Sequence, residues 1–402
     1  MERVFIVSAK RTAVGKFLGT LEKVPVVELG VSVVKNILNE TKIDPAKIDE
    51  VIVGNILMAG QGQGIARQIA VKAGIPVEVP AYGLNMICGS GLKAVMNAYN
   101  AIRSSEANLI LAGGAESMSG AGFIIPSSAR SGFKMGEQKI TDHMIYDSLT
   151  DAFSNLHMGI TAENVAEMLN ISREEQDQLA ITSQQRAIAA IDGGKFKDEI
   201  VPVEIATRKA TITFAEDEFV NRTTSLEKLA SLKPAFKKDG TVTAGNASGI
   251  NDGAAFVLIA SEKAVKEMNL TPMAEIVATG QGGVEPSIMG LGPVAAIKNA
   301  LGKTDLQLGD MDVLELNEAF AAQALGVQKQ LSEQHNVTRE WLNERTNKNG
   351  GAIAIGHPVG ASGCRILVSL LHEMKRSNNT YGLASLCIGG GMGTCVIVKS
   401  AK

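Results

Sequence analysis

Short apolar runs alternate with amphipathic stretches along most of the chain, and this alternation predicts strands and helices in turn. Residues 48–55 form an apolar run of the length of a buried strand, and residues 64–70 continue with the spacing of a helix. Strands alternating with helices are typical of right-handed crossovers in a mostly parallel sheet covered on both faces. The pattern therefore predicts an α/β fold.

The predicted elements occur twice. Each copy has the order strand, helix, strand, helix, strand, and three pairs of segments read alike: 48–55 with 311–318, 89–95 with 361–367, and 109–116 with 382–390. We expect two βαβαβ halves packed back to back in a layered body.

A loop-rich segment separates the two halves. Residues 119–244 carry most of the loops, and their one clear helix, 176–192, follows a capping box made by Ser172 and Glu175. We predict an N-terminal half of residues 1–118 with 245–270, a loop domain of residues 119–244, and a C-terminal half of residues 271–402. The insertion is interpreted as a cover for the substrate, since loops on α/β scaffolds carry binding surfaces; a decoration without function is the alternative.

Composition narrows the classes of function. The 402 residues include 42 glycines, 45% hydrophobic and only 4% aromatic residues, which suggests a closely packed aliphatic core. A net charge of −3 gives no support for nucleic-acid binding. No secretory signal and no membrane span is visible, and four cysteines without paired short spacings favour reduced thiols in the cytoplasm and no metal site.

Cys88 ends an apolar run, 81–87, and precedes Gly89-Ser90-Gly91, where a helix is expected to begin. Unpaired N–H groups and the helix dipole would favour a thiolate there and lower the thiol pKa from its free value of about 8.5. An inert buried cysteine is the alternative. The glycine-rich turn favours a nucleophile.

His357 stands between Gly356 and Pro358, so it is expected in a tight loop at the end of a strand. Its imidazole can take a proton from Cys88 and later donate to an oxyanion. A structural hydrogen bond is the alternative for a single histidine.

Two further polar positions follow predicted strands. Asn317 can hold a water or a carbonyl oxygen there, or can cap the helix that follows. Cys387 precedes a run of three glycines, where the N–H of Gly389 could help to bind an anion. Cys364 and Cys395 are interpreted as core residues, and Cys387 could also be one.

Together these motifs resemble the thiolase family over essentially the whole chain, which implies a layered αβαβα body with an inserted loop domain. The resemblance implies that Cys88 is acylated and that His357 activates it. It further implies that Asn317 holds a water in one oxyanion hole, that the amides of Cys88 and Gly389 form a second, and that Cys387 moves the α-proton.

The resemblance also suggests a site for the pantetheine and nucleotide of coenzyme A. The residues that it places there are His157, Met158, Arg222, Ala244, Ser248 and Phe320. Met158 would fill space that a long acyl chain needs. Two departures from the family pattern are the long stretch 330–345 and Ser148, which stands where glycine is common.

The implied reaction joins two acetyl-CoA molecules into acetoacetyl-CoA and CoA, or cleaves acetoacetyl-CoA in reverse, with no cofactor beyond the CoA of the substrate. Such a step belongs to lipid metabolism, including the mevalonate pathway. A homotetramer is implied, with Phe123 to Lys139 as the tetramerisation loop. Three alternatives remain open: a degradative 3-ketoacyl-CoA thiolase of broader chain length, a decarboxylating ketoacyl synthase, and a non-catalytic CoA- or lipid-binding relative.

Overall fold

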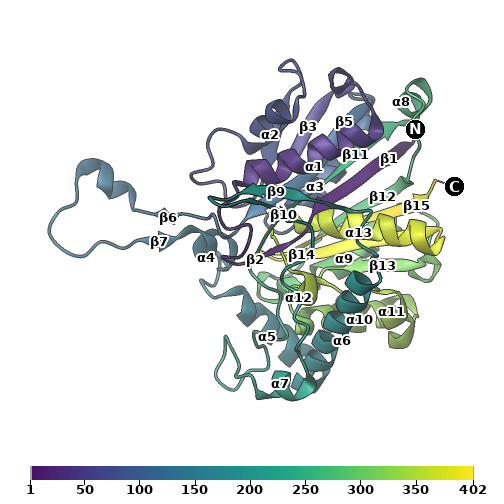
Figure 1. Cartoon of the computed structure of the whole chain (residues 1–402). Coiled ribbons are helices and arrows are strands. Elements are labelled where there is room, and N and C mark those ends of the chain that lie inside the picture. The colour runs from purple at the N-terminus through teal and green to yellow at the C-terminus, as the bar shows by residue number, and fades with distance from the viewer. Residues whose placement is uncertain (1, 402) are drawn as a thin grey trace.

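A computed structural model describes residues 2–401 (Figure 1). The strands are β1 (Val4–Thr12), β2 (Gly15–Lys16), β3 (Glu50–Gly54), β4 (Ala81–Leu84), β5 (Leu109–Ser117), β6 (Phe123–Ile124), β7 (Thr141–Asp142), β8 (Ile200–Val201), β9 (Val203–Ala206), β10 (Thr211–Phe214), β11 (Asn251–Ser261), β12 (Ala274–Gly283), β13 (Val313–Leu316), β14 (Tyr381–Ile388) and β15 (Met392–Ser400).

The α-helices are α1 (Val26–Thr41), α2 (Ile65–Ala73), α3 (Ser90–Arg103), α4 (His143–Ser148), α5 (Met158–Leu169), α6 (Arg173–Asp192), α7 (Leu226–Ser231), α8 (Glu262–Glu267), α9 (Gly292–Leu301), α10 (Ala321–His335), α11 (Arg339–Arg345), α12 (Ala352–Ile355) and α13 (Ser362–Ser377). Short 3₁₀ helices cover Pro45–Lys47, Ser127–Ser131, Pro286–Leu291 and Leu308–Asp310.

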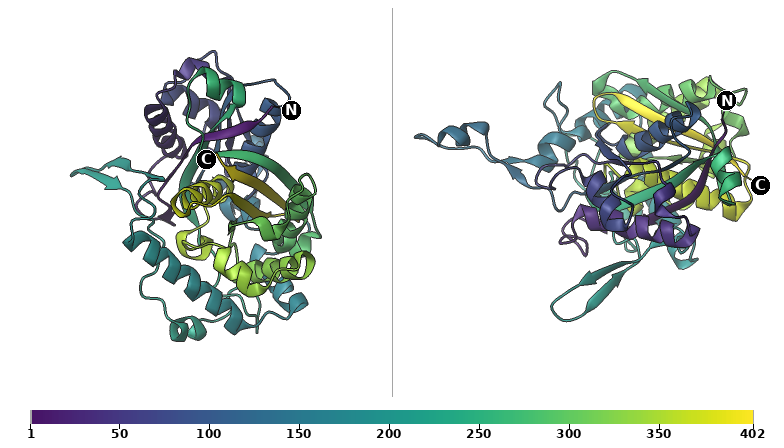
Figure 2. Two further views of the ribbon diagram at one scale, coloured as in Figure 1. Left: turned by 90° about the vertical axis from the view of Figure 1, so that its right-hand side faces the viewer. Right: turned by 90° about the horizontal axis from the view of Figure 1, so that it is seen from above.

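The sheet consists of two halves joined at one seam. Its main path runs β13-β14-β15-β12-β1-β11-β5-β3-β4. At the seam, β1 and β12 share only the pairs Phe5–Glu275 and Ile6–Ala274, so the halves are joined over a short distance. Both chain termini lie at the end of the molecule opposite a projecting arm (Figure 2).

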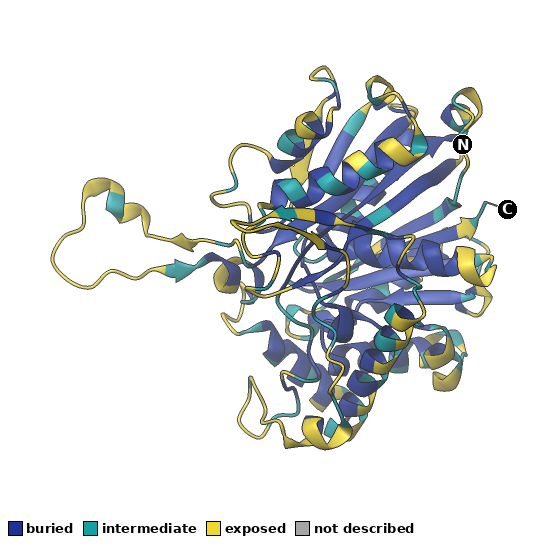
Figure 3. Ribbon diagram, viewed as in Figure 1, coloured by how far each residue is buried: buried dark blue, intermediate teal, exposed yellow. Residues whose placement is uncertain are grey.

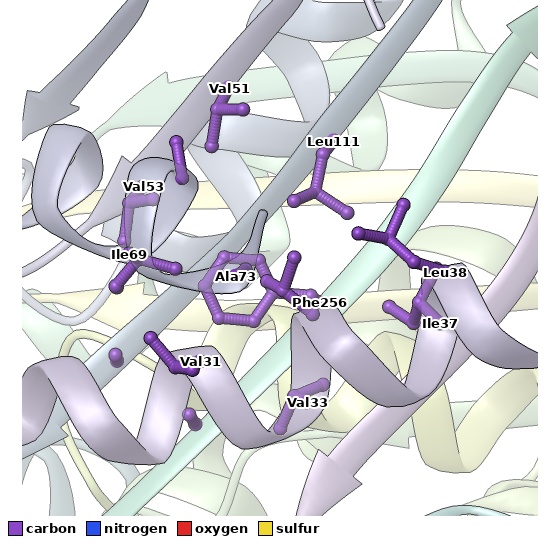
Figure 4. Packing of buried hydrophobic residues seen from close by; sticks show 14 of the residues in the cluster. Val31, Val33, Ile37, Leu38, Val51, Val53, Ile69, Ala73, Leu111 and Phe256 are labelled. Carbon is purple, nitrogen blue, oxygen red and sulfur yellow. The ribbon is translucent and has the colours of Figure 1, made fainter. Parts of the chain in front are cut away.

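Three apolar clusters separate the layers, and the strands between them are buried (Figure 3). Helices α1 and α2 cover the N-terminal half of the sheet, where Val33, Ile69 and Phe256 pack together (Figure 4). Helices α3 and α13 fill the middle layer, and α9 and α10 cover the C-terminal half. The predicted αβαβα layering is therefore confirmed.

The prediction of a mostly parallel sheet is wrong. Strand β11 enters between β1 and β5 and is antiparallel to both, and β14 turns back directly into β15. The C-terminal half also lacks a counterpart of the edge strand β4, because the element expected there is reduced to a bridge between Leu314 and Thr346. His357 accordingly follows the short helix α12, and not a strand as predicted.

The repeat is nevertheless visible in matching hydrogen bonds. Asp49 accepts the backbone N–H groups of Asn108 and Leu109 at the start of β5, at 2.6 and 2.9 Å. Asp312 accepts those of Thr380 and Tyr381 at the start of β14, at 2.7 and 3.0 Å. These two aspartates fix the correspondence between the halves.

The segment 119–244 contributes both an arm and a cover. Strands β6 and β7 form the base of the arm that projects from the body (Figure 1). Helices α5 and α6 pack on α10 and α12 of the C-terminal half, whereas β8 pairs with β1. Capping by Ser172 and Glu175 starts α6 at Arg173, three residues before the predicted start. The segment thus lies across both halves, and the proposed domain boundaries stay a prediction.

Candidate active site

The cover and the two halves of the body enclose a cavity of about 870 Å³. Ten of the eleven residues singled out from the sequence line it, and they are Cys88, His157, Met158, Arg222, Ala244, Ser248, Phe320, His357, Cys387 and Gly389. Asn317 lies behind the wall, two residues before the lining residue Ala319.

A strained turn holds Cys88 between β4 and α3. Ile87 has a φ of 47°, which is unfavourable for a β-branched residue. Ser90 stabilises the turn by donating to the Ile87 carbonyl at 2.6 Å and accepting from the Met86 N–H at 2.9 Å. The predicted strand 81–87 therefore ends at Leu84, and the turn presents Cys88 to the cavity.

The expected low pKa of Cys88 is wrong. Burial raises the pKa of this thiol to about 11. The backbone N–H groups of Gly389 and of Cys88 itself lower it, and the buried Glu116 carboxyl raises it further. Although Cys88 keeps some exposed surface, it sits deep in the cavity, where desolvation of a thiolate outweighs two N–H donors. The resting residue is a thiol that needs a base.

His357 is positioned by both halves of the molecule. Its backbone N–H donates to Asn251 Oδ1 at 2.8 Å, and Asn251 Nδ2 donates to the Gly15 carbonyl at 3.0 Å. Burial, followed by the positive charge of Arg365, lowers the pKa of His357 to about 3. The imidazole is therefore neutral near pH 7 and can accept a proton.

The hydrogen bonds of Ser362 determine which nitrogen accepts that proton. Ser362 Oγ lies 2.9 Å from the Pro358 carbonyl and 2.6 Å from His357 Nδ1. A carbonyl can only accept, so the single hydroxyl proton goes to Pro358 and Nδ1 must donate to Ser362. His357 Nε2 is left without a proton, and it has no partner among the described residues.

Cys387 lies at the end of β14 and lines the same cavity as Cys88. Burial, followed by repulsion from Cys88 when that residue is a thiolate, raises the pKa of Cys387 strongly. The chain then turns at Gly390 and Gly391, whose φ values of 83° and 85° favour glycine. This turn brings the Gly389 N–H towards the Cys88 sulfur.

Asn317 follows β13 and is buried. Its backbone N–H donates to the Ser385 carbonyl at 3.0 Å, but neither Oδ1 nor Nδ2 has a partner among the described residues. It does not cap α10, which begins at Ala321. The carboxamide is thus available to a small polar molecule, as native proteins rarely leave both atoms unpaired.

An aromatic wall faces the two cysteines. The His157 ring stacks on Phe236 at 4.6 Å between centroids, and Phe236 meets the edge of Phe320 at 6.1 Å. His157 also caps α5 by accepting the Gly159 N–H at Nδ1. Burial lowers the pKa of His157, so this residue forms a neutral part of the wall.

The mouth of the cavity is more polar than the aromatic wall. Arg222 is about half exposed and donates to Asp192 at 2.8 Å. Ser248 lies deeper, where its backbone N–H donates to the Ala319 carbonyl at 2.9 Å. Lys16 and Phe17 complete the mouth from the start of the chain.

Several lining or supporting residues were missed from the sequence. They are Lys16, Phe17, Phe219, Phe236, Met289, Asn251 and Ser362. Asn251 lies three residues after Ser248, and Ser362 lies in the repeated segment 361–367, so amide and hydroxyl side chains near these positions were the available signal. The others lie in loops or in very short elements, Lys16 in β2 and Met289 in the 3₁₀ helix Pro286–Leu291, without a recognisable pattern.

No group of three or more histidines, cysteines or acids placed to hold a metal ion occurs among residues 2–401. No helix in that range is both long and apolar enough to cross a bilayer.

Family comparisons agree with this geometry. The thiolase N-terminal domain matches residues 4–263, and the thiolase C-terminal domain matches residues 270–400. The chain therefore belongs to the thiolase family, as its motifs indicated.

Individual relatives indicate which thiolases the chain is similar to. The chain is 54% identical to the acetyl-CoA acetyltransferase of Cupriavidus necator, over 99% of this chain and 100% of the relative. It is 51% identical to a probable acetyl-CoA acyltransferase of Staphylococcus aureus over the full length of both chains.

Solved structures with the same fold include an acetyl-CoA acetyltransferase from Bacillus anthracis, with a TM-score of 0.95, 42% identity, and 100% and 99% coverage of the two chains. Human mitochondrial 3-ketoacyl-CoA thiolase in complex with CoA has a TM-score of 0.93, 45% identity, and 100% and 98% coverage.

Proposed function

We propose that this thiolase is an acetyl-CoA C-acetyltransferase that joins two acetyl-CoA molecules into acetoacetyl-CoA and CoA, and catalyses the reverse thiolysis. The observation that carries the proposal is one cavity containing two cysteines of raised pKa, a neutral imidazole and two converging N–H groups. Full-length similarity to proteins named acetyl-CoA acetyltransferase supports the substrate.

In the first step, His357 Nε2 takes the proton from the Cys88 thiol. The thiolate attacks the acetyl carbonyl carbon, and the bond between that carbon and the CoA sulfur breaks. The proton held by His357 passes to the CoA thiolate, which leaves as free CoA. The N–H groups of Cys88 and Gly389 stabilise the oxyanion that forms on the way.

In the second step, Cys387 acts as the base. It gives up its own proton to the neutral His357 and then takes an α-proton from a second acetyl-CoA. Asn317, through a bound water, and His357 stabilise the enolate oxygen. The enolate carbon attacks the acetyl carbonyl on Cys88, the carbon–sulfur bond breaks, and the proton held by His357 restores the Cys88 thiol.

The high pKa of Cys387 suits this second role. An α-proton of a thioester is weakly acidic, so a weak base would remove it slowly. Burial makes the Cys387 thiolate strongly basic once it has formed.

The rest of the cavity is proposed to hold the CoA portion of the substrate, without a further cofactor. Ala244, Ser248 and Phe320 would flank the pantetheine, and Arg222 at the mouth would face the nucleotide. Met158 is buried beside Gly389 and limits the room for the acyl group, which favours short chains over the longer substrates of degradative enzymes.

We also propose a cytoplasmic homotetramer. The four cysteines are all free, as expected in a reducing compartment. The arm from Phe123 to Lys139 exposes large apolar side chains, including Phe123, Phe133 and Met135, which suit contacts between subunits. Sedimentation of the whole protein, and of a variant with these three residues changed to serine, tests the assembly.

The activity is tested by measuring rates in both directions with acyl-CoA substrates of increasing length. We expect acetyl-CoA condensation and acetoacetyl-CoA thiolysis, with a fall of at least about tenfold in kcat/KM for 3-oxooctanoyl-CoA. Equal rates with the longer substrate would indicate a 3-ketoacyl-CoA thiolase of broader range. A preference for malonyl-CoA would indicate a decarboxylating synthase.

A further inference from the structure

A second, smaller cavity of about 270 Å³ adjoins the acyl position. It shares Ser148, Met158 and Gly389 with the main cavity, and Ile87, the neighbour of Cys88, also lines it. The shared residues place the second cavity next to the position of an acyl group on Cys88. The remaining lining residues are Tyr146, Asp147, Thr150, Asp151, Ala152, Asn155 and Gly390.

Two buried oxygens in this lining lack partners within residues 2–401. Ser148, the last residue of α4, has an unpaired hydroxyl. Asp151 Oδ2 accepts from the Ser154 N–H and hydroxyl, both at 2.7 Å, whereas Asp151 Oδ1 accepts from no protein group. Ser154 thus holds the carboxyl in place and leaves one oxygen free to bind a donor. Buried polar atoms of this kind are uncommon without a function.

The lining also has a definite charge. It includes the carboxyls of Asp147 and Asp151 and no lysine or arginine. Asp147 is exposed and pairs with His143, whereas Asp151 is buried and pairs with no lysine or arginine among residues 2–401. A carboxylate on the acyl tail would be repelled here, and an alkyl tail would leave Asp151 Oδ1 and the Ser148 hydroxyl unpaired.

We propose that this cavity is a subsite for short acyl groups that carry a hydroxyl on the tail, recognised by Ser148 and Asp151. A hydroxyl both donates and accepts, so it can donate to Asp151 Oδ1 and accept from Ser148. An ammonium group could donate to both oxygens, but it could not accept the proton of the Ser148 hydroxyl. The inference rests on the proposed function, because the acyl group must first be attached to Cys88.

The test compares acylation of Cys88 by two CoA thioesters of nearly equal size. 3-Hydroxypropionyl-CoA and butyryl-CoA differ by a hydroxyl in place of a methyl group, and succinyl-CoA adds a carboxylate. Acetyl-CoA serves as the reference substrate. Single-turnover rates are measured as the release of CoA from the full-length enzyme, with the adduct identified by mass.

We expect 3-hydroxypropionyl-CoA to react about tenfold faster than butyryl-CoA, and succinyl-CoA to react more slowly than both. Ser148→Ala should bring the ratio of the first two rates close to one. Tyr146→Phe removes an exposed hydroxyl from the rim of the same cavity and should keep the wild-type ratio. The ratio is taken within each variant, so a general loss of activity does not affect it.

Equal rates for the first two thioesters in the wild type would overturn the subsite. A ratio that survives Ser148→Ala, or collapses in Tyr146→Phe, would overturn its assignment to the buried pair. Absence of any acetyl adduct would instead overturn the proposed function itself, so the two failures are distinguishable.

Discussion

The two halves of the body share one scaffold but differ at the ends of their strands. Counting from the matching aspartates Asp49 and Asp312, the residue that corresponds to Asn317 is Gly54. By the same register, the residue that corresponds to Cys387 is Ala115. The C-terminal half thus carries an amide and a thiol at positions where the N-terminal half has no functional side chain.

Packing explains part of this difference. A side chain at Gly54 would collide with the start of α3, since its Cβ would lie 2.4 Å from the Ser90 carbonyl carbon. The N-terminal half uses that space to bring α3, and with it Cys88, close to the sheet. The C-terminal half uses the equivalent space for Asn317. A duplicated fold can therefore supply the nucleophile from one copy and the remaining groups from the other.

The largest effect is expected when Cys387 is replaced by alanine, the residue found at the corresponding position 115 of the N-terminal half. Cys387→Ala should reduce condensation and thiolysis by at least about 10³-fold, because it removes the base proposed to take the α-proton. Steady-state rates in both directions check this. Retention of more than a tenth of the activity would show that another base acts.

His357→Asn should have the next largest effect, a loss of about 10²- to 10³-fold in Cys88 acylation at pH 7. The pH dependence of the acylation rate gives a second test, because wild type and variant should differ in its direction. With a histidine pKa of about 3, the wild-type rate should be nearly flat from pH 5 to pH 9. Without the base, the rate should rise with pH towards the Cys88 pKa of about 11. A variant rate independent of pH would contradict this account.

The mirrored serines allow a matched comparison. Ser362→Ala should slow acylation by about 10- to 10²-fold, because Nδ1 loses its acceptor and the Nε2-protonated tautomer becomes accessible. Ser362→Thr should recover much of the rate. Ser90→Ala, which loses the corresponding hydroxyl at the first residue of α3, should lower the free energy of unfolding by about 1–2 kcal/mol and should slow acylation less than Ser362→Ala does. Equal kinetic effects of the two alanine variants would refute a special role for Ser362.

Asp49 and Asp312 should have equivalent structural roles in the two halves. Asp49→Ala and Asp312→Ala each remove a carboxylate that accepts two backbone N–H groups near the surface. Each should lower the free energy of unfolding by about 1 kcal/mol and leave the rates of catalysis within about twofold. Urea denaturation and steady-state rates check both effects, and a large kinetic effect of either variant would contradict a purely structural role.

Much of the fold could be predicted because the relevant signals are local. The alternation of elements, the repeat and the capping box at Ser172 all led to features that the structure contains. The direction of β11 could not be predicted, since it depends on where the chain returns after the long insertion. The strand expected before His357 was wrong because Gly350–Gly356 turns into the short α12 instead.

The candidate site was predictable in its residue types and less so in its energetics. Glycine-rich turns drew attention to Cys88, His357 and Cys387, and the family resemblance suggested their roles. The pKa of Cys88 was predicted with the wrong sign, because the helix dipole is visible in a sequence and the depth of burial is not. Phe236 and Asn251 were missed for the same reason, as their contacts join segments far apart in the chain.

The division of labour between the two cysteines is tested most directly by locating the acetyl group after incubation with acetyl-CoA. Peptide mass measurement on the wild type and on Cys387→Ala should find one acetyl group on Cys88 in both proteins. An acetyl group on Cys387 in the wild type, or its loss from Cys88 in the variant, would contradict the account.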